Sequence, residues 1–305
     1  MVFDSLHPMS IILKMTNGAS AFLKWAGGKQ ALARLIASVV PAQFGRYVEP
    51  FLGGGSVFFA VRPREALLSD ANGWLVDTYL AIRDDWKAVA ACLDRMPNTK
   101  EDYLRIRASS PDALGPAQRA AHLIYLNKTC FRGLFRVNRK GQFNVPYGAY
   151  DRRYYDPECL AAVALALKSA SLDRCDFEET LSQARAGDFV YLDPPYVKLG
   201  GYSDFNRYTS SQFREHDHRR LADACGLLSA RGVRWLLSNS DTSLVRELYK
   251  GNAFQRIPAR REINLSSSER DIDELLVSNY PISVNAPSLF DHVGVEAELR
   301  VRQSA

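Results

Sequence analysis

The sequence contains few cysteines and no long apolar segment. Its 305 residues include five cysteines, and no two of them form a Cys-x-x-Cys pair. Neither a zinc site nor a disulfide framework is expected from this spacing in a chain of this length. No apolar run approaches the roughly 20 residues that a membrane helix needs. The apolar patch at residues 11–13 lacks the length and the cleavage site of a signal peptide, so a cytoplasmic protein is the default expectation.

Signatures of two large enzyme classes are also missing. The glycine stretch Gly53-Gly54-Gly55 lacks the Gly-Lys-Ser/Thr ending of a P-loop, which disfavours a triphosphate site. No motif pairs a nucleophile with a base as in the common hydrolases. We therefore expect neither a phosphotransferase nor a hydrolase.

Positive charge is concentrated in one part of the chain. The formal net charge is only +5, which permits nucleic-acid binding without requiring it. Residues 128–150, however, contain no Asp or Glu. The basic residues of this stretch are Lys128, Arg132, Arg136, Arg139 and Lys140. This stretch is the candidate nucleic-acid contact.

Strand and helix patterns alternate on both sides of a mostly helical middle. Residues 46–49, 66–70, 189–192 and 234–238 read as strands, which predicts an α/β fold with a mostly parallel sheet. We expect this α/β domain to comprise residues 20–71 and 168–285. Residues 72–167 form a helical insertion with a basic β-hairpin, whose strands are 134–137 and 142–145. Residues 1–19 and 286–305 are expected to be loosely ordered tails.

A glycine loop and an acid follow the first two predicted strands. Glycines at 53–55 allow a ligand close to the backbone, and Asp70 has the spacing of an acid that accepts hydrogen bonds from ribose hydroxyls. Upstream, Lys29 is suited to pair with a ligand carboxylate and Trp25 to pack on its apolar part. An ordinary glycine turn, a core Trp and solvated lysines remain the alternative for each motif taken alone.

The motif Asp193-Pro194-Pro195-Tyr196 follows another buried strand. The Asp193 carboxylate and the Pro194 carbonyl are two acceptors, and consecutive prolines restrict the loop so that both are held in place. Tyr196 offers a flat face on which a base can stack. Such a loop suits an exocyclic amine, although a strand-ending turn with a packed Tyr is the alternative.

Several of these motifs occur in the order that one family shows. From Phe22 to Tyr280 the chain resembles the Dam-type (D12 class, alpha group) DNA adenine N6-methyltransferases. The resemblance rests on residues 22–29, the glycine loop 49–56, Asp70, the segments 127–138 and 143–148, the Asp-Pro-Pro-Tyr loop, and residues 238–242 and 260–263. Several ordered motifs are far more specific than any single one.

The resemblance implies a Rossmann-like S-adenosylmethionine-dependent methyltransferase sheet with the insertion as target-recognition domain. It implies no metal, and S-adenosylhomocysteine as the product. The catalytic residues would be Asp193, Pro194, Pro195 and Tyr196. The residues expected at the cofactor are Trp25, Lys29, Phe51, Gly53, Gly55, Asp70, Asp176, Phe177 and Asp193. Those expected at double-stranded DNA are Lys24, Arg132, Arg136, Asn138, Arg139 and Lys140.

One position departs from the family pattern. Many members that read GATC carry Asn where this chain has Arg132. Arg favours a bidentate contact to guanine and Asn one to adenine, so the target sequence is left open. A phosphate contact, which carries no sequence information, is the alternative role for Arg132.

Three other functions compete with adenine methylation. The Asp-Pro-Pro-Tyr chemistry suits cytosine N4 or an RNA amine equally well, and only the hairpin segment and the motif order favour adenine in DNA. A DNA-binding module without catalysis is disfavoured because every expected catalytic position is occupied. No membrane and no obligate protein partner is implied, while a cognate restriction endonuclease remains open.

Overall fold

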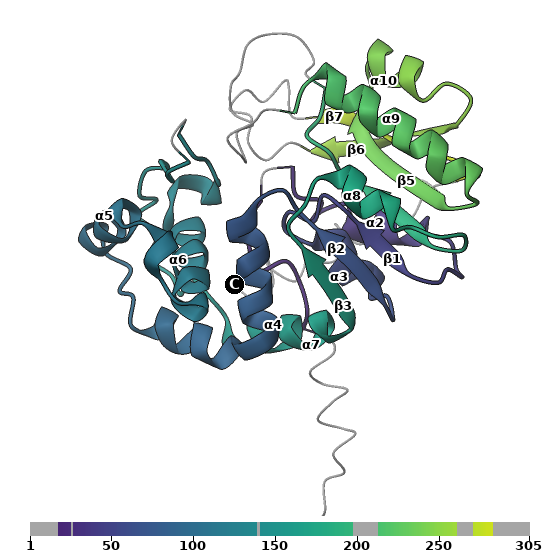
Figure 1. The fold of residues 1–305 in the computed structure, drawn as a ribbon. Helices are drawn as coiled ribbons and strands as arrows, with labels where there is room; N and C mark the ends of the chain where they lie inside the picture. The colour runs from purple at the N-terminus through teal and green to yellow at the C-terminus, as the bar shows by residue number, and fades with distance from the viewer. Residues whose placement is uncertain (1–17, 26, 139–140, 198–212, 261–270, 283–305) are drawn as a thin grey trace, which may run out of the picture.

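The protein is built on a seven-stranded sheet, as Figure 1 shows for the computed structural model. The structure describes residues 18–25, 27–138, 141–197, 213–260 and 271–282. The sheet order is β3-β2-β1-β4-β5-β7-β6. The strands are β1 Tyr47–Glu49, β2 Ala66–Ser69, β3 Ala170–Asp173, β4 Phe189–Leu192, β5 Arg234–Ser240, β6 Ala253–Arg260 and β7 Asp271–Ser278. The first five pair in parallel and β7 is antiparallel to both neighbours, which confirms the expected α/β fold.

The helices largely follow the apolar periodicity of the sequence. They are α2 Ala33–Ser38, α3 Ser56–Val61, α4 Gly73–Asp94, α5 Lys100–Ala108, α6 Pro116–Thr129, α7 Pro157–Ala166, α8 Phe177–Ser182, α9 Glu215–Ala230 and α10 Ser243–Leu248. Capping side chains fix several starts: Asn72 accepts a hydrogen bond from the Leu75 amide, and Asp156 accepts one from the Glu158 amide.

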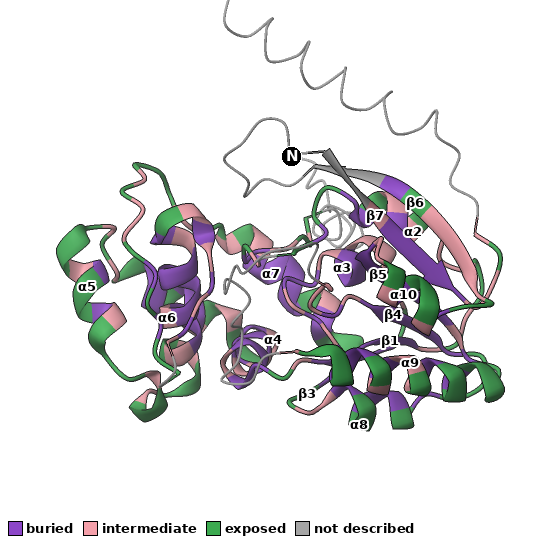
Figure 2. Ribbon diagram, turned by 90° about the horizontal axis from the view of Figure 1, so that it is seen from above, coloured by how far each residue is buried: buried purple, intermediate pink, exposed green. Residues whose placement is uncertain are grey.

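Alternate residues of the central strands point to opposite faces of the sheet. In β4, Phe189 and Tyr191 join the apolar core under α2, α3, α4 and α7. Val190 and Leu192 join a second core under α8, α9 and α10. Figure 2 shows buried residues on the strands and on the helix sides that face them. Both faces are therefore covered, as parallel sheets require.

The expected helical insertion lies beside the sheet (Figure 1). Helix α4 packs against both α6 and α7, while α5 packs on α6 at the outer side. Residues of α4, α6 and the hairpin belong to the same apolar core as Tyr191 and Leu236 of the sheet. One continuous core therefore fixes the insertion rigidly against the edge where the ligand loops lie.

The basic hairpin is an antiparallel pair without regular strands. Two isolated bridges join Val137 to Phe143 and Cys130 to Tyr147. Alternate side chains are buried, namely Phe135, Val137, Phe143 and Val145. The predicted pairing is therefore present, but Pro146 and the left-handed residues 132 and 133 limit the ladder to single bridges. Arg139 and Lys140 at the turn lie outside the described residues.

The expected tails, 1–19 and 286–305, also lie outside the described residues, apart from residues 18 and 19. Among the helices that the structure describes, none is long and apolar enough to cross a membrane.

The central strand β5 offers a direct test of the core. Leu236 is fully buried, so Leu236→Ala should lower the free energy of unfolding by about 2–5 kcal/mol. Leu227 on α9 is 64% exposed, and Leu227→Ala should change the free energy of unfolding by less than about 0.5 kcal/mol. Urea unfolding followed by circular dichroism measures both variants. Equal losses would contradict this placement of β5.

Candidate active site

The predicted ligand loops meet at one edge of the sheet. The glycine loop follows β1, Asp70 follows β2 and Asp193 follows β4. Strand β1 lies between β2 and β4 and is parallel to both, so the three carboxyl ends are adjacent. Ligands of open α/β sheets bind at this edge. The sequence motifs therefore form one site although they are far apart in the chain.

Asp70 fixes the glycine loop. Its carboxylate accepts hydrogen bonds from the Gly53 amide at 3.0 Å and the Asn72 amide at 2.8 Å. Gly53 has a φ of +48°, and a Cβ there would lie 2.9 Å from Cδ1 of Trp25. Burial raises the pKa of Asp70, and the two amides counteract the shift. The loop thus places the Gly53 backbone and the Asp70 carboxylate next to the Trp25 ring.

The buried Lys29 and the partly exposed Asp193 form an ion pair at the centre of the site. The Lys29 Nζ lies 2.8 Å from one carboxylate oxygen of Asp193 and 3.0 Å from the other. It also donates to the Gly27 carbonyl at 2.6 Å. Burial raises the pKa of Asp193 to about 6, while Lys29 lowers it and the negative Glu274 raises it. A carboxylate held this way titrates close to neutral pH.

Glu274 of β7 joins this pair, and the sequence analysis missed it. Its Oε2 accepts a hydrogen bond from the Tyr196 hydroxyl at 2.9 Å and lies 4.0 Å from Lys29 Nζ. Lys29 Nζ is also 4.7 Å from the centre of the Tyr196 ring. Glu274 sits opposite Ser240 of β5 in the antiparallel register. No local motif marks it, because only the return of β7 beside β5 brings it to the site.

Asn239 supports the Asp-Pro-Pro-Tyr loop from β5. Its side-chain oxygen accepts hydrogen bonds from the amides of Val197, 3.1 Å away, and Ser240, 2.8 Å away. Asn239 is fully buried. Its Nδ2 and the Ser240 Oγ find no hydrogen-bond partner among the described residues. Asn239 belongs to the sequence motif 238–242, but the sequence analysis did not predict that this motif holds the Asp-Pro-Pro-Tyr loop.

Phe51 and Phe177 come together beside the glycine loop. Their rings are stacked with centres 5.4 Å apart, and Phe213, which was not predicted, lies 5.9 Å from each. Because the aromatic group packs at the end of β1, it can bound a flat ligand at this side of the site.

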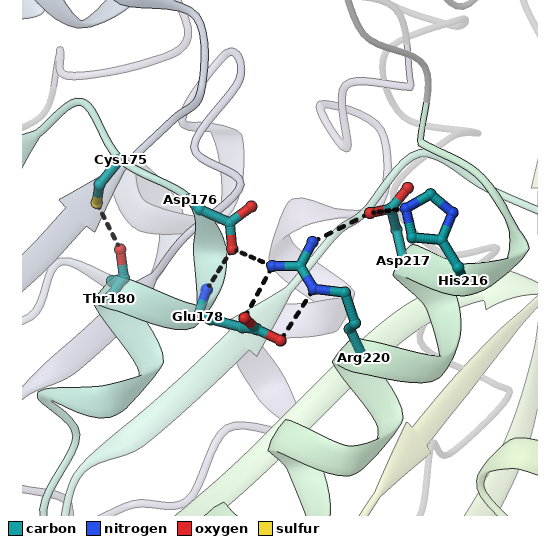
Figure 3. Close-up of polar contacts among 7 residues, drawn as sticks. All are labelled: Cys175, Asp176, Glu178, Thr180, His216, Asp217 and Arg220. Atoms are coloured by element: carbon teal, nitrogen blue, oxygen red, sulfur yellow. Dashed lines mark hydrogen bonds and ion pairs between the residues drawn. The ribbon is translucent and has the colours of Figure 1, made fainter.

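Asp176 is held in a network of charges (Figure 3). Its carboxylate accepts from the Glu178 amide at 3.0 Å and from Arg220 at 2.9 Å. Arg220 of α9 also pairs with Glu178 and Asp217, at 2.8 Å and 3.1 Å. The network fixes Asp176 next to Phe177. Because the network is partly exposed to solvent, it fixes the position of Asp176 and contributes little to the free energy of unfolding.

Three of the residues expected at DNA, Lys24, Arg132 and Arg136, lie beside or on the first arm of the hairpin. Lys24 is exposed, and its stem packs on Gly133. Arg132 has a φ of +60°, and its amide donates to the Tyr150 hydroxyl at 2.8 Å. Arg136 donates to the side-chain oxygen of Asn144 at 2.8 Å.

Two predicted residues have further structural contacts. Asn138 bridges the hairpin turn through hydrogen bonds to Gln142, and its DNA contact stays a prediction. Trp25 touches the glycine loop and also stacks on Phe135 of the hairpin, with ring centres 4.7 Å apart. The indole therefore lies between the glycine loop and the basic hairpin.

Several known proteins are similar to this chain over most of its length. A type II methyltransferase of Lactococcus lactis subsp. cremoris is 37% identical over 282 residues. The match covers 89% of this chain and 99% of that protein. A type II methyltransferase of Methanocaldococcus jannaschii is 35% identical, over 85% of this chain and 98% of its own. A DNA adenine methylase of Vibrio cholerae is 36% identical, over 84% and 94%.

The family described as D12 class N6 adenine-specific DNA methyltransferase matches residues 25–263. This range includes the glycine loop, the hairpin and the Asp-Pro-Pro-Tyr loop, and it agrees with the parallel sheet that brings them together. The chain belongs to the D12 class of N6 adenine-specific DNA methyltransferases.

Proposed function

We propose that this protein transfers the methyl group of S-adenosylmethionine to N6 of an adenine turned out of double-stranded DNA. The observation that carries the proposal is the Lys29–Asp193 ion pair at the carboxyl edge, next to Pro194, Pro195 and Tyr196, with side chains 3% and 17% exposed. Family membership favours adenine in DNA over cytosine N4 or RNA. The occupied catalytic loop argues against an inactive binding module.

The catalytic loop would act on the exocyclic amine by accepting its hydrogens. The Asp193 carboxylate accepts one N–H and the Pro194 carbonyl accepts the other, which draws the nitrogen lone pair out of the ring and makes it available for bonding. The prolines hold both acceptors in place. The hydrogen bond to Glu274 fixes the Tyr196 ring, on which the base stacks.

The residues at the sheet edge fit S-adenosylmethionine and its product S-adenosylhomocysteine. Glycines 53 and 55 have positive φ angles and leave bare backbone where the ligand approaches. Asp70 would accept from the ribose hydroxyls, while Phe51, Asp176 and Phe177 would bound the adenine. Lys29, Asp193 and Trp25 would hold the methionine end. When bound, the sulfonium supplies an activated methyl group, so the chain needs no nucleophile of its own.

No metal is required for this chemistry. Among the described residues, no group of three or more His, Cys, Asp or Glu side chains could hold an ion. We propose that residues 20–71 and 168–285 bind the methyl donor and that residues 72–167 recognise DNA. The type II names of two relatives make a cognate restriction endonuclease the partner to look for.

Arg132 would contact the target sequence or a phosphate next to it. Asn adopts the left-handed conformation far more readily than Arg, so Arg132 is held at φ +60° at a cost of about 1–2 kcal/mol. The hairpin holds Arg132 in this conformation, at a position where, by the family resemblance, many members that read GATC carry Asn. We infer that the target differs from GATC at the contacted base pair. Lys24, Arg136, Asn138, Arg139 and Lys140 would complete the DNA contact.

Asp193→Ala should lower kcat for methyl transfer by about 10²–10⁴-fold, because one acceptor for the amine is lost. Labelled S-adenosylmethionine with varied-sequence DNA measures the rate, and mapping of the modified bases identifies the target. Asp84→Ala on α4 is the control, since that side chain is 64% exposed and should not affect the rate. Full activity of the Asp193 variant would overturn the mechanism.

The rate should depend on pH through Asp193. Because the acceptor must be ionised and its pKa is about 6, kcat/KM should fall as the pH drops below about 6. Glu274 raises this pKa, so Glu274→Gln should move the acid limb to lower pH while an amide oxygen still accepts from Tyr196. Profiles of kcat/KM between pH 4.5 and pH 8, roughly the range in which such a carboxyl titrates, test the shift. An upward shift would contradict the assignment.

Arg132→Asn should change the preferred target by an amount typical of one bidentate base contact, about 1–3 kcal/mol. Methylation of a randomised duplex library followed by sequencing measures the preference. Arg153→Asn removes an equal charge from an exposed position of the same insertion, and should leave the preference unaltered. If both variants kept the parent preference, Arg132 would bind a phosphate and the inferred difference from GATC would fail.

A further inference from the structure

Tyr79 of α4 contacts the glycine loop from inside the protein. It is fully buried, and its hydroxyl donates to the Gly53 carbonyl at 3.0 Å. Gly55 leaves room for this contact, because a Cβ there would lie 3.1 Å from the Tyr79 hydroxyl oxygen. Burial, together with the charges of Glu49 and Asp70, raises the pKa of Tyr79, so the hydroxyl stays protonated and can donate. The Gly53 carbonyl is therefore held towards α4.

The three glycine amides of this loop differ in their hydrogen bonds. The Gly53 amide donates to the Asp70 carboxylate at 3.0 Å. The Gly55 amide donates to the Leu52 carbonyl at 2.8 Å. Gly54 is buried, and its amide finds no acceptor among the residues that the structure describes. Because a buried backbone N–H without a partner is rare in proteins, this one points to a ligand.

The carbonyl of Gly53 and the N–H of Gly54 belong to one peptide group. No peptide bond in the described ranges is cis, and in a trans peptide these two groups point in opposite directions. Since Tyr79 holds the carbonyl towards α4, the Gly54 N–H points away from that helix. A Cβ on Gly54 would lie 3.5 Å from the Cβ of Trp25. The unpaired N–H is therefore next to a residue that the proposed function places at the methionine end of the ligand.

The carboxylate of S-adenosylmethionine is a suitable acceptor for this N–H. Lys29 lies at the same end, but its Nζ already contacts both Asp193 oxygens, at 2.8 Å and 3.0 Å, and the Gly27 carbonyl at 2.6 Å. An ammonium has three hydrogens, so a ligand carboxylate beside Lys29 gains from a second donor. A hydrogen bond from a backbone N–H to a carboxylate is charge-assisted and therefore strong.

We propose that Tyr79 is a positioning residue for the methyl donor: it fixes the Gly53–Gly54 peptide so that the Gly54 N–H binds the carboxylate of S-adenosylmethionine. This inference rests on the proposed function. Tyr79 itself touches no ligand. It prevents the peptide from turning over, a rotation that the two glycines would otherwise permit. The N–H is thereby oriented before the ligand binds, which lowers the ordering cost of binding.

A variant that lacks only the hydroxyl tests this role. Tyr79→Phe keeps the ring, which packs edge-on against Phe22 with centres 5.3 Å apart, and leaves the Gly53 carbonyl without its partner. Tyr125→Phe on α6 is the matched control, because Tyr125 is also fully buried and its hydroxyl donates to the Pro97 carbonyl at 2.8 Å. Both variants lose one buried hydrogen bond to a carbonyl, so their unfolding midpoints in urea should fall by similar amounts.

Isothermal titration calorimetry measures the affinity for S-adenosylhomocysteine and for its decarboxylated analogue, which lacks only the carboxylate. Tyr79→Phe should weaken the binding of S-adenosylhomocysteine by about 10-fold and that of the analogue by less than about 2-fold, because one hydrogen bond to a charged group is impaired. Tyr125→Phe should leave both affinities at the parent values. Unchanged affinities in Tyr79→Phe, or an equal loss for the two ligands, would overturn the inference.

Amide hydrogen exchange of the parent, followed by NMR, tests the same contact without a variant, and it decides if Tyr79→Phe does not fold. S-adenosylhomocysteine should slow the exchange of the Gly54 amide by about 10-fold or more relative to the decarboxylated analogue, since a hydrogen-bonded N–H exchanges only on opening. Equal rates with the two ligands would refute the contact.

The two proposals fail in different ways. A parent that binds S-adenosylhomocysteine and methylates adenine, but shows no difference between the two ligands in Tyr79→Phe or at Gly54, refutes only the inference. A parent that binds no S-adenosylhomocysteine refutes the proposed function.

Discussion

The ion pair between Lys29 and Asp193 is the contact on which the geometry of the site depends. It joins a residue just before α2 to one just after β4, so it ties the N-terminal motif to the centre of the sheet. An ammonium buried without a partner would be strongly unfavourable, and so would a lone carboxylate. Each side chain therefore compensates the charge of the other, and Tyr196 and Glu274 lie next to the pair.

Several acidic side chains gather at this edge of the sheet. Besides Asp193, the carboxyl groups of Glu49 and Asp70 follow neighbouring strands, and Glu274 completes the set. Burial, together with the charges of Asp193 and Asp70, raises the pKa of Glu49, which accepts from the Tyr47 hydroxyl at 2.9 Å. Lys29 is the only basic side chain paired with this group among the described residues.

The continuous core between sheet and insertion gives the hairpin its fixed place beside the donor loops. Trp25, Phe135 and Phe143 carry aromatic contact from the glycine loop into the hairpin, and α4 supplies the surface beneath them. The hairpin and the loops at the sheet edge thus belong to one packed unit. The exposed Lys24 and the left-handed Arg132 stand at its outer surface.

The sequence by itself determined the strands, most helices, the glycine loop with Asp70, and the Asp-Pro-Pro-Tyr loop, because these depend on local periodicity and short motifs. It also indicated the basic stretch around Arg132 and Arg136. Only the tertiary structure decided that Glu274, Phe213 and Asn239 lie beside these loops. Their proximity results from strand register and helix packing between segments far apart in the chain, and no local pattern encodes such distances. For the same reason the sequence placed Trp25 at the donor alone, whereas packing sets it between donor loop and hairpin.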